Sequence, residues 1–170
     1  MGAVHTDLYV IMGVSGSGKT TIGSALAGAW GAAFLEGDSL HPPGNLQRMA
    51  AGIPLTDEDR RPWLNAIAQR LRDARRARTG LVVACSALKR IYRDLLRSSG
   101  AADVRFIYLA GERGLIAERM AQRRGHFMPS SLLDSQFVSL EEPSPEEDAW
   151  VCDIRQPPDA IVADLLKRTA

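Results

Sequence analysis

The stretch that decides the fold is Gly13-Val14-Ser15-Gly16-Ser17-Gly18-Lys19-Thr20. It fits the Walker A pattern, in which a glycine and four free positions precede Gly-Lys-Thr. The apolar run 8–12 before it predicts a short buried strand. The residues after it predict a helix, because one face of that helix would carry Ile22, Ala25, Leu26 and Ala29. Strand, loop and helix together are the context that a phosphate-binding loop requires, and a glycine-rich turn with an unrelated lysine would lack it.

The composition of this loop suggests its chemistry. Gly13, Gly16 and Gly18 lack the side chain that would block a phosphate or forbid unusual backbone angles. Backbone N–H groups can then face an anion, with the positive end of the helix dipole behind them. We therefore expect residues 13–20 to bind the phosphates of ATP. Lys19 would reach the β- and γ-phosphates, and Thr20 would hold Mg²⁺ through its hydroxyl.

Composition limits the classes of protein to which the chain can belong. It has 170 residues, 45% apolar and 24% charged, which suits one globular domain with a sizeable core. A formal net charge of +1 gives no sign of a nucleic-acid-binding surface. Cys85 and Cys152 lie in apolar runs and are expected to be buried thiols rather than a disulfide or a zinc site. No run is long enough to span a membrane and no signal peptide opens the chain, so we expect a cytoplasmic protein.

Apolar runs and amphipathic segments alternate along the rest of the chain. Further strands are predicted at 33–35, 81–85, 104–109 and 149–154. Helices are predicted at 45–51, at 112–124 and at 132–140. Three more are predicted: one that starts at the cap residue Thr56, one that follows the turn at 86–88 and ends near 98, and one that follows Pro158. The acidic stretch 141–148 is expected to be a surface loop. This alternation predicts an α/β, three-layer P-loop NTPase fold with a five-stranded parallel sheet flanked by helices. We expect a single domain over 1–170, with a small helical lid at about 120–140.

The acids near the phosphate loop favour a kinase over a hydrolase. Most P-loop ATPases place an acid at the end of a later apolar strand, and the run 81–85 ends without one. Glu36 and Asp38 instead follow the run 33–35, with a spacing that puts both on one side of an extended backbone. One carboxylate can organise the waters of Mg²⁺, and the other can orient an attacking hydroxyl. The alternative is that Asp38 only caps a turn.

A cluster of arginines marks the expected lid. Arg119, Arg123 and Arg124 precede the Gly-His-Phe break at 125–127. Arginines over a transferring phosphoryl group neutralise its charge, and Gly125 offers a hinge for closure. An exposed arginine face without a binding role is the alternative interpretation.

These segments resemble the gluconate kinases, small P-loop kinases related to shikimate kinase. The resemblance covers almost the whole chain. It is carried by GVSGSGKT at 13–20, FLEGDSLHPPGN at 34–45, RMAAGIPLTDEDRRPWL at 48–64, CSALKRIYRDLLR at 85–97, FIYLAGE at 106–112, RMAQRRGHFMPSSLLDSQF at 119–137 and VCDIRQPP at 151–158. The first of these is shared with many families, whereas the second, third and fourth together are far more specific.

The resemblance implies an ATP- and Mg²⁺-dependent gluconokinase that phosphorylates D-gluconate on its 6-hydroxyl, and a homodimer. By position, Asp38 would orient the substrate hydroxyl, with Lys19 and Arg124 as further catalytic residues. Arg60 would bind the gluconate carboxylate, because its planar guanidinium suits one. The other residues expected around the substrate are His41, Arg48, Ser86, Lys89 and Gln136.

The resemblance also places the nucleotide. Arg119, Arg155 and Pro158 are expected to line the ATP site, with the adenine ring near residues 155–158. Position 36 is Glu where many relatives have Asp, so its carboxylate sits one methylene further out. We expect Glu36 at the Mg²⁺ site, either as a direct ligand or through water.

Two rival functions share the phosphate loop. A kinase of another small hydroxy acid, such as shikimate, would share the lid and the mechanism. The His-Pro-Pro-Gly-Asn loop at 41–45 and the helix start at 55–63 favour gluconate. A non-catalytic ATP sensor is the other rival, and a sensor needs no hydroxyl-orienting acid such as Asp38.

Overall fold

A computed structural model of the chain describes residues 6–98, 101–122 and 130–169. Within these ranges, parallel strands form one five-stranded sheet in the order β2-β3-β1-β4-β5. The strands are β1 (Leu8–Met12), β2 (Ala33–Glu36), β3 (Leu81–Ala84), β4 (Arg105–Ala110) and β5 (Trp150–Asp153). The helices are α1 (Lys19–Trp30), α2 (Pro43–Ala50), α3 (Asp57–Ala77), α4 (Arg90–Arg97), α5 (Arg113–Gln122), α6 (Ser130–Ser139) and α7 (Pro158–Arg168), with short 3-10 segments η1 (Gly37–Leu40) and η2 (Pro145–Glu147).

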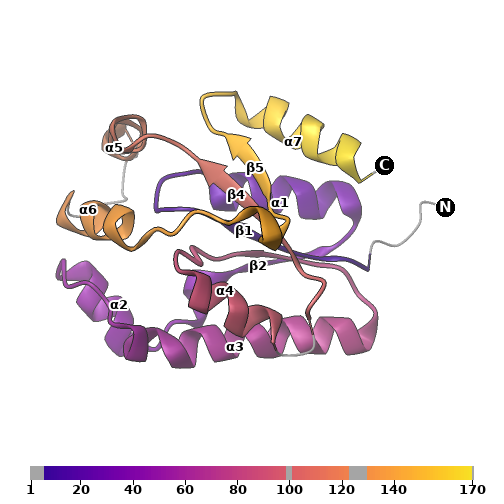
Figure 1. The fold of residues 1–170 in the computed structure, drawn as a ribbon, viewed down its shortest axis with the longest axis horizontal. Helices are drawn as coiled ribbons and strands as arrows, with labels where there is room; N and C mark the ends of the chain where they lie inside the picture. Colours follow the sequence, from indigo (N-terminus) through magenta and orange to yellow (C-terminus); the bar gives the residue numbers. More distant parts are fainter. Residues whose placement is uncertain (1–5, 99–100, 123–129, 170) are drawn as a thin grey trace.

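Helices cover both faces of the sheet, as the alternation of runs predicted (Figure 1). On one face, α3 and α4 bury Trp63, Ile67 and Leu96 against the strands. On the other face, α1 and α7 bury Leu26 and Ile161. Because both faces are covered, every residue of β1 and β3 is buried. The three-layer fold predicted from sequence is confirmed.

Local signals set the ends of the helices. The Thr56 hydroxyl accepts from the Asp59 N–H, and the Asp59 carboxylate accepts from the Thr56 N–H, which closes a capping box at the start of α3. Gly31 ends α1 in the left-handed conformation, with φ at +67°. The helix expected at 45–51 begins two residues earlier, at Pro43. Proline is accepted in the first turn, where its missing N–H would have no helical partner.

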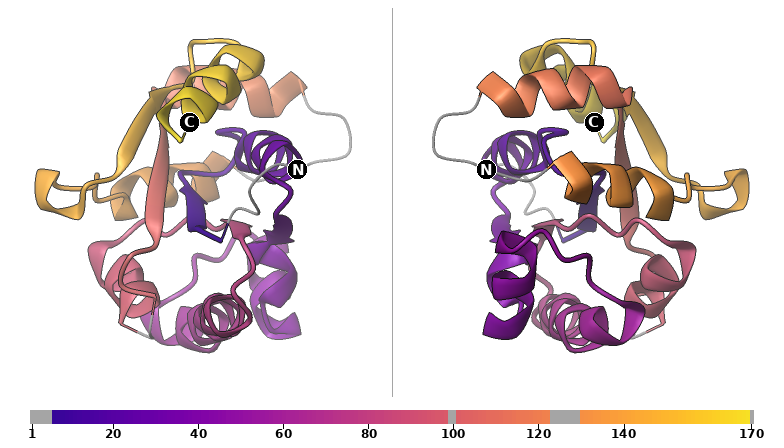
Figure 2. Two further views of the ribbon diagram at one scale, coloured as in Figure 1. Left: turned by 90° about the vertical axis from the view of Figure 1, so that its right-hand side faces the viewer. Right: turned by 90° about the vertical axis from the view of Figure 1, so that its left-hand side faces the viewer.

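The direction of the strands decides where a ligand can bind. The start of β1 and the end of α7 lie at the opposite end of the sheet from α2 and α6 (Figure 1). Seen from the α6 end, α6 lies between a layer of α1 and α5 and a layer of α2 and α3 (Figure 2). Ligands of open parallel sheets bind at the carboxyl ends of the strands.

None of the helices within the described residues has the length and apolar character needed to cross a membrane.

The acidic stretch 141–148 is largely the exposed loop that was predicted, although it contains the short 3-10 segment η2. The exception is the Glu147 side chain, which is only 1% exposed. Acidic composition predicts exposure, whereas a carboxylate is buried when cations compensate it. Arg93 and Arg97 of α4 supply those cations.

Candidate active site

The phosphate-binding loop joins β1 to α1 with glycine in positions that other residues rarely adopt. Gly18 has φ at +102° and caps α1. A Cβ on Gly13 would lie 2.8 Å from Ser17 Oγ, closer than real Cβ contacts. The Lys19 ammonium donates to the carbonyls of Gly13 and Val14, both at 3.0 Å, and so closes the loop around itself. The glycine conformations and the Lys19 contacts therefore fix the backbone shape of the loop.

The loop fits an anion such as the phosphates of ATP. Ser17 is buried, and its hydroxyl has no hydrogen-bond partner among the described residues. A buried hydroxyl without a partner is costly unless a ligand satisfies it. Lys19 lies beside it, and α1 points its N-terminal end at the same place.

A possible metal position lies where α1 meets the end of β2. The Thr20 hydroxyl donates to the Glu36 carboxylate, so two oxygen ligands face each other there. Mg²⁺ is usually held by one or two protein oxygens together with phosphates and water, rather than by a protein cage. Among the described residues, no group of three or more His, Cys, Asp or Glu side chains is placed to hold a metal ion. Thr20 and Glu36 therefore fit Mg²⁺ bound beside a nucleotide.

A cavity of about 80 Å³ opens next to the phosphate loop. Six of the residues predicted from sequence for the substrate or the chemistry line it: Lys19, Asp38, His41, Arg60, Ser86 and Gln136. Trp63 and Leu55 add an apolar wall. A small cavity with a few convergent polar groups is typical of a site for a small polar molecule.

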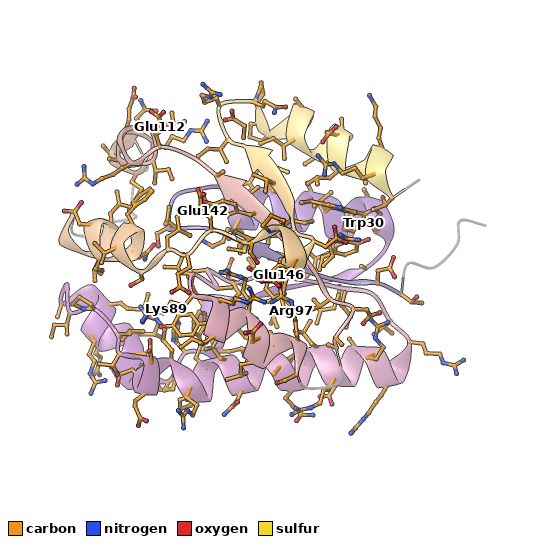
Figure 3. All side chains as sticks on the ribbon, viewed as in Figure 1. Trp30, Lys89, Arg97, Glu112, Glu142 and Glu146 are labelled. Atoms are coloured by element: carbon orange, nitrogen blue, oxygen red, sulfur yellow. The ribbon has the colours of Figure 1, made fainter. Side chains whose placement is uncertain are left out.

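Arg48 and Lys89 do not line this cavity. Arg48 pairs with the Asp59 carboxylate. The Lys89 ammonium lies 3.0 Å from Asp57 Oδ1, near the end of the molecule where α2 and α6 lie (Figure 3). Both side chains are thus paired with carboxylates and lie outside the lining of the cavity.

Arg60 is held in place by neighbours that the sequence analysis did not single out. Its Nη1 donates to the Leu55 carbonyl at 2.6 Å and to the Tyr92 hydroxyl at 3.0 Å. Tyr92 in turn donates to Asp57, and these contacts from Tyr92 and Lys89 lower the pKa of the Asp57 carboxyl. The guanidinium is therefore preorganised at the cavity wall. The Asp-Glu-Asp-Arg sequence at 57–60 was the only local sign that Arg60 has charged neighbours. The role of Tyr92 could not be predicted, because it depends on how α4 packs against α3.

His41 is a buried, neutral member of the site. Its ring stacks on Trp63, with centroids 4.1 Å apart and planes 16° from parallel. Burial, and secondarily the charge of Arg60, lower the pKa of His41 to about 4. The imidazole is therefore uncharged at neutral pH.

A second cavity, of about 320 Å³, lies on the other side of the phosphate loop. It is lined by Gly16, Ser17, Gly18, Thr21, Ile22, Arg119, Ile154, Gln156, Pro158 and Ile161. The isoleucines and the proline form apolar walls of the kind that suit a flat aromatic base. Arg119 and Pro158, which the resemblance predicted for the ATP site together with the loop residues, are among the lining residues.

Arg155 lies outside this cavity. Its side chain is 78% exposed and pairs with Asp153. Gln156, its neighbour, lines the cavity instead.

The expected lid is described only in part. Arg124 falls within 123–129, outside the described residues, so its predicted place stays a prediction. Gln136 of α6 reaches the phosphate loop, where its Oε1 accepts from the Ser15 N–H at 2.6 Å and its Nε2 donates to Ser15 Oγ at 3.0 Å. Helix α6 therefore contacts the phosphate loop and lines the 80 Å³ cavity through one side chain.

Comparison with known proteins agrees with this geometry. The AAA domain profile matches residues 8–143. The thermoresistant gluconokinase of Escherichia coli K12 is 45% identical over 161 residues, covering 94% of this chain and 91% of the relative. The chain belongs to the gluconokinase family. The gluconokinase of Gluconobacter oxydans 621H is 44% identical, covering 93% of this chain and 88% of that protein.

Solved structures give the same picture of the family. The crystal structure of a gluconokinase from Sinorhizobium meliloti 1021 has a TM-score of 0.87 at 49% identity, covering 97% of this chain and 92% of that one. A shikimate kinase from Acinetobacter baumannii has a TM-score of 0.62 at 16% identity, which shows a shared fold alone. The resemblance found in the sequence is thus confirmed at the level of the family.

Proposed function

We propose that this chain transfers the γ-phosphoryl group of ATP to the 6-hydroxyl of D-gluconate, giving 6-phospho-D-gluconate and ADP. The observation that carries the proposal is the 44–50% identity to proteins named gluconokinase, over most of the chain. The cavity adds chemistry that suits this substrate. The Arg60 guanidinium in its wall suits the carboxylate of gluconate, and the neutral and acidic side chains that line it suit the hydroxyl groups.

The nucleotide would lie across the phosphate loop. Backbone N–H groups of residues 13–18 and the Lys19 ammonium would bind its phosphates, and the cavity near Pro158 would hold the base. Mg²⁺ bound at the Thr20 hydroxyl, with Glu36 acting through water, would neutralise phosphate charge during transfer. Arg119 lies at the edge of the base cavity, and Arg124 stays a predicted lid cation.

Asp38 would orient the acceptor hydroxyl in the other cavity. Its carboxylate accepts the hydroxyl proton as the oxygen attacks the γ-phosphorus and the bond to ADP breaks. Arg60 would bind the gluconate carboxylate at the other end of the molecule, because Leu55 and Tyr92 fix it at the wall. Ser86, His41 and Gln136 would supply hydrogen bonds to the polyol. Arg48 and Lys89, which pair with Asp59 and Asp57, stay predicted substrate contacts.

A homodimer in the cytoplasm is the remaining part of the proposal. The family resemblance is what supports it. Light scattering after gel filtration would give the mass. A mass of one chain at micromolar concentration would contradict the dimer.

Identification of the product tests the activity itself. The protein is incubated with ATP, Mg²⁺ and gluconate, and the product is examined by ³¹P and ¹³C NMR. We expect a phosphate monoester coupled to C6. Phosphate on another carbon would refute the proposed orientation. A parallel incubation with shikimate in place of gluconate tests the rival kinase, which faster phosphorylation of shikimate would favour.

A further inference from the structure

The Asn45 side chain lies between the substrate cavity and the start of α3. Its Nδ2 donates to the backbone carbonyl of Asp59 at 2.8 Å and lies 3.2 Å from Nδ1 of His41. A carbonyl oxygen can only accept, so the amide nitrogen must face Asp59. The second hydrogen of the same NH₂ group is then directed at Nδ1. His41 Nδ1 must therefore accept, and the ring proton sits on Nε2.

The Nε2 atom faces Asp38 across a gap of defined size. Nε2 lies 3.9 Å from Asp38 Oδ1, too far for a direct hydrogen bond. Two hydrogen bonds of about 2.8 Å that meet at one oxygen at about a right angle span about 4 Å. A single hydroxyl oxygen fits that gap, since it can accept from Nε2–H and donate to the carboxylate. Both side chains line the same cavity.

The surroundings hold this donor rigid and uncharged. His41 and Asn45 are both buried, and the Trp63 ring fixes the plane of the imidazole. The charged groups that share the cavity with it are Asp38 from η1, Arg60 from α3 and Lys19 from the phosphate loop. Burial and Arg60 keep the pKa of His41 near 4, so at neutral pH the ring donates through Nε2 alone.

We propose that Asn45 is a positioning residue that fixes His41 as an Nε2–H donor, so that His41 and Asp38 hold one substrate hydroxyl between them. This rests on the proposed function, because the hydroxyl is that of the sugar acid. The arrangement selects an oxygen that both accepts and donates. An ammonium group in that place has no lone pair to accept the Nε2 hydrogen, and a deoxy sugar leaves both side chains without their partner.

Histidine ¹⁵N NMR on the unaltered protein tests the tautomer without any variant. The chain has three histidines, and His41→Gln assigns the signal. We expect a proton on Nε2, none on Nδ1, and no titration between pH 8 and 5. A proton on Nδ1, or titration near the ordinary pKa of about 6.5, would overturn the inference.

Asn45→Asp tests the consequence for activity. A carboxylate at this position accepts the Nδ1 proton and raises the pKa of His41. Below that pKa the imidazolium still donates from Nε2, whereas above it Nε2 is bare. We expect kcat/KM for gluconate to fall about tenfold or more as pH rises through the new pKa, over a range where the unaltered enzyme shows no such fall.

Gln47→Glu is the matched control, because it makes the same amide-to-carboxylate change at an exposed position of α2. It should keep the profile of the unaltered enzyme. If Asn45→Asp lowers kcat/KM equally at every pH, Asn45 only holds α2 against α3. That result would refute the positioning role. If that variant does not fold, the NMR result decides. If His41 carries its proton on Nε2 but the protein does not phosphorylate gluconate, the proposed function is refuted. If the protein phosphorylates gluconate but His41 carries its proton on Nδ1, only this inference is refuted.

Discussion

Arg93 Nε of α4 lies 2.7 Å from Glu147 Oε1 of η2, and both side chains are withdrawn from solvent. Arg93 also donates to the carbonyls of Ala87 and Leu88, and Leu88 lines the substrate cavity. Arg97 joins the pair with a bond of 2.8 Å to the same carboxylate oxygen. The ion pair therefore ties the segment after α6 to the loop that forms one wall of the cavity.

Glu147→Gln should destabilise the protein strongly. It keeps the shape of the side chain but leaves the Arg93 charge buried without its partner, which costs about 3 kcal/mol or more. Glu146→Gln is the control, because Glu146 pairs with Arg90 but is 69% exposed, and such pairs contribute about 1 kcal/mol or less. Figure 3 labels Glu146 and Arg97 in this region. Urea unfolding measures both variants, and equal losses would contradict the buried-pair account.

The same pair predicts an acid-side loss of stability. Burial alone would raise the pKa of Glu147, but hydrogen bonds from Arg93, Ser144 and Arg97 outweigh it and lower the pKa from 4.5 to about 2. A carboxyl with a depressed pKa in the folded state stabilises above its ordinary pKa, and this contribution is lost as pH falls from about 4.5 to 2. The difference in unfolding free energy between the unaltered protein and Glu147→Gln should therefore shrink on acidification. A constant difference from pH 6 to 3 would contradict this assignment.

Glu36→Gln should raise the Mg²⁺ concentration needed for half-maximal activity by about tenfold, because outer-sphere partners tune metal affinity by about 10- to 100-fold. The Thr20 hydroxyl would keep a hydrogen-bond acceptor, so the loop itself should stay in place. Titration of activity with Mg²⁺ at saturating ATP measures the effect. Glu58→Gln, at an exposed position of α3, controls for the lost charge. An unchanged Mg²⁺ requirement would remove Glu36 from the metal site.

Asp38→Asn should lower kcat by about 100-fold or more while ATP binding is kept. The amide cannot take the hydroxyl proton, and Asp38 lines the substrate cavity rather than the one near Pro158. Turnover and equilibrium nucleotide binding are measured separately on the same preparation. Asp73→Asn, on the exposed side of α3, should behave as the unaltered enzyme. Full turnover in Asp38→Asn would exclude it from the mechanism.

The fold and the phosphate loop could be predicted from the sequence because their signals are local. The glycines of 13–18 and the apolar run before them are contiguous, and Thr56 and Asp59 form their capping box within one helical turn. The predicted ends of the strands lie within one residue of the observed ends, since each strand is a short apolar run in the sequence.

The rest of the site depends on packing between segments far apart in the chain. The contact of Gln136 with Ser15 joins residues 121 positions apart, and nothing near either residue specifies it. The buried pair of Arg93 and Glu147 could not be predicted, because charge compensation between two elements leaves no periodic pattern in the sequence. The contact of Asn45 with His41 is local, since the two residues are four positions apart. Its contact with Asp59 is not, because it depends on the packing of α2 against α3.

A coupled assay of ADP release tests the central claim most directly. The protein is given ATP and Mg²⁺ with gluconate, with shikimate, or with no acceptor. The account predicts release with gluconate and little release with shikimate or without an acceptor. Equal release in all three would show that water takes the phosphoryl group, and would contradict the assignment as a gluconokinase.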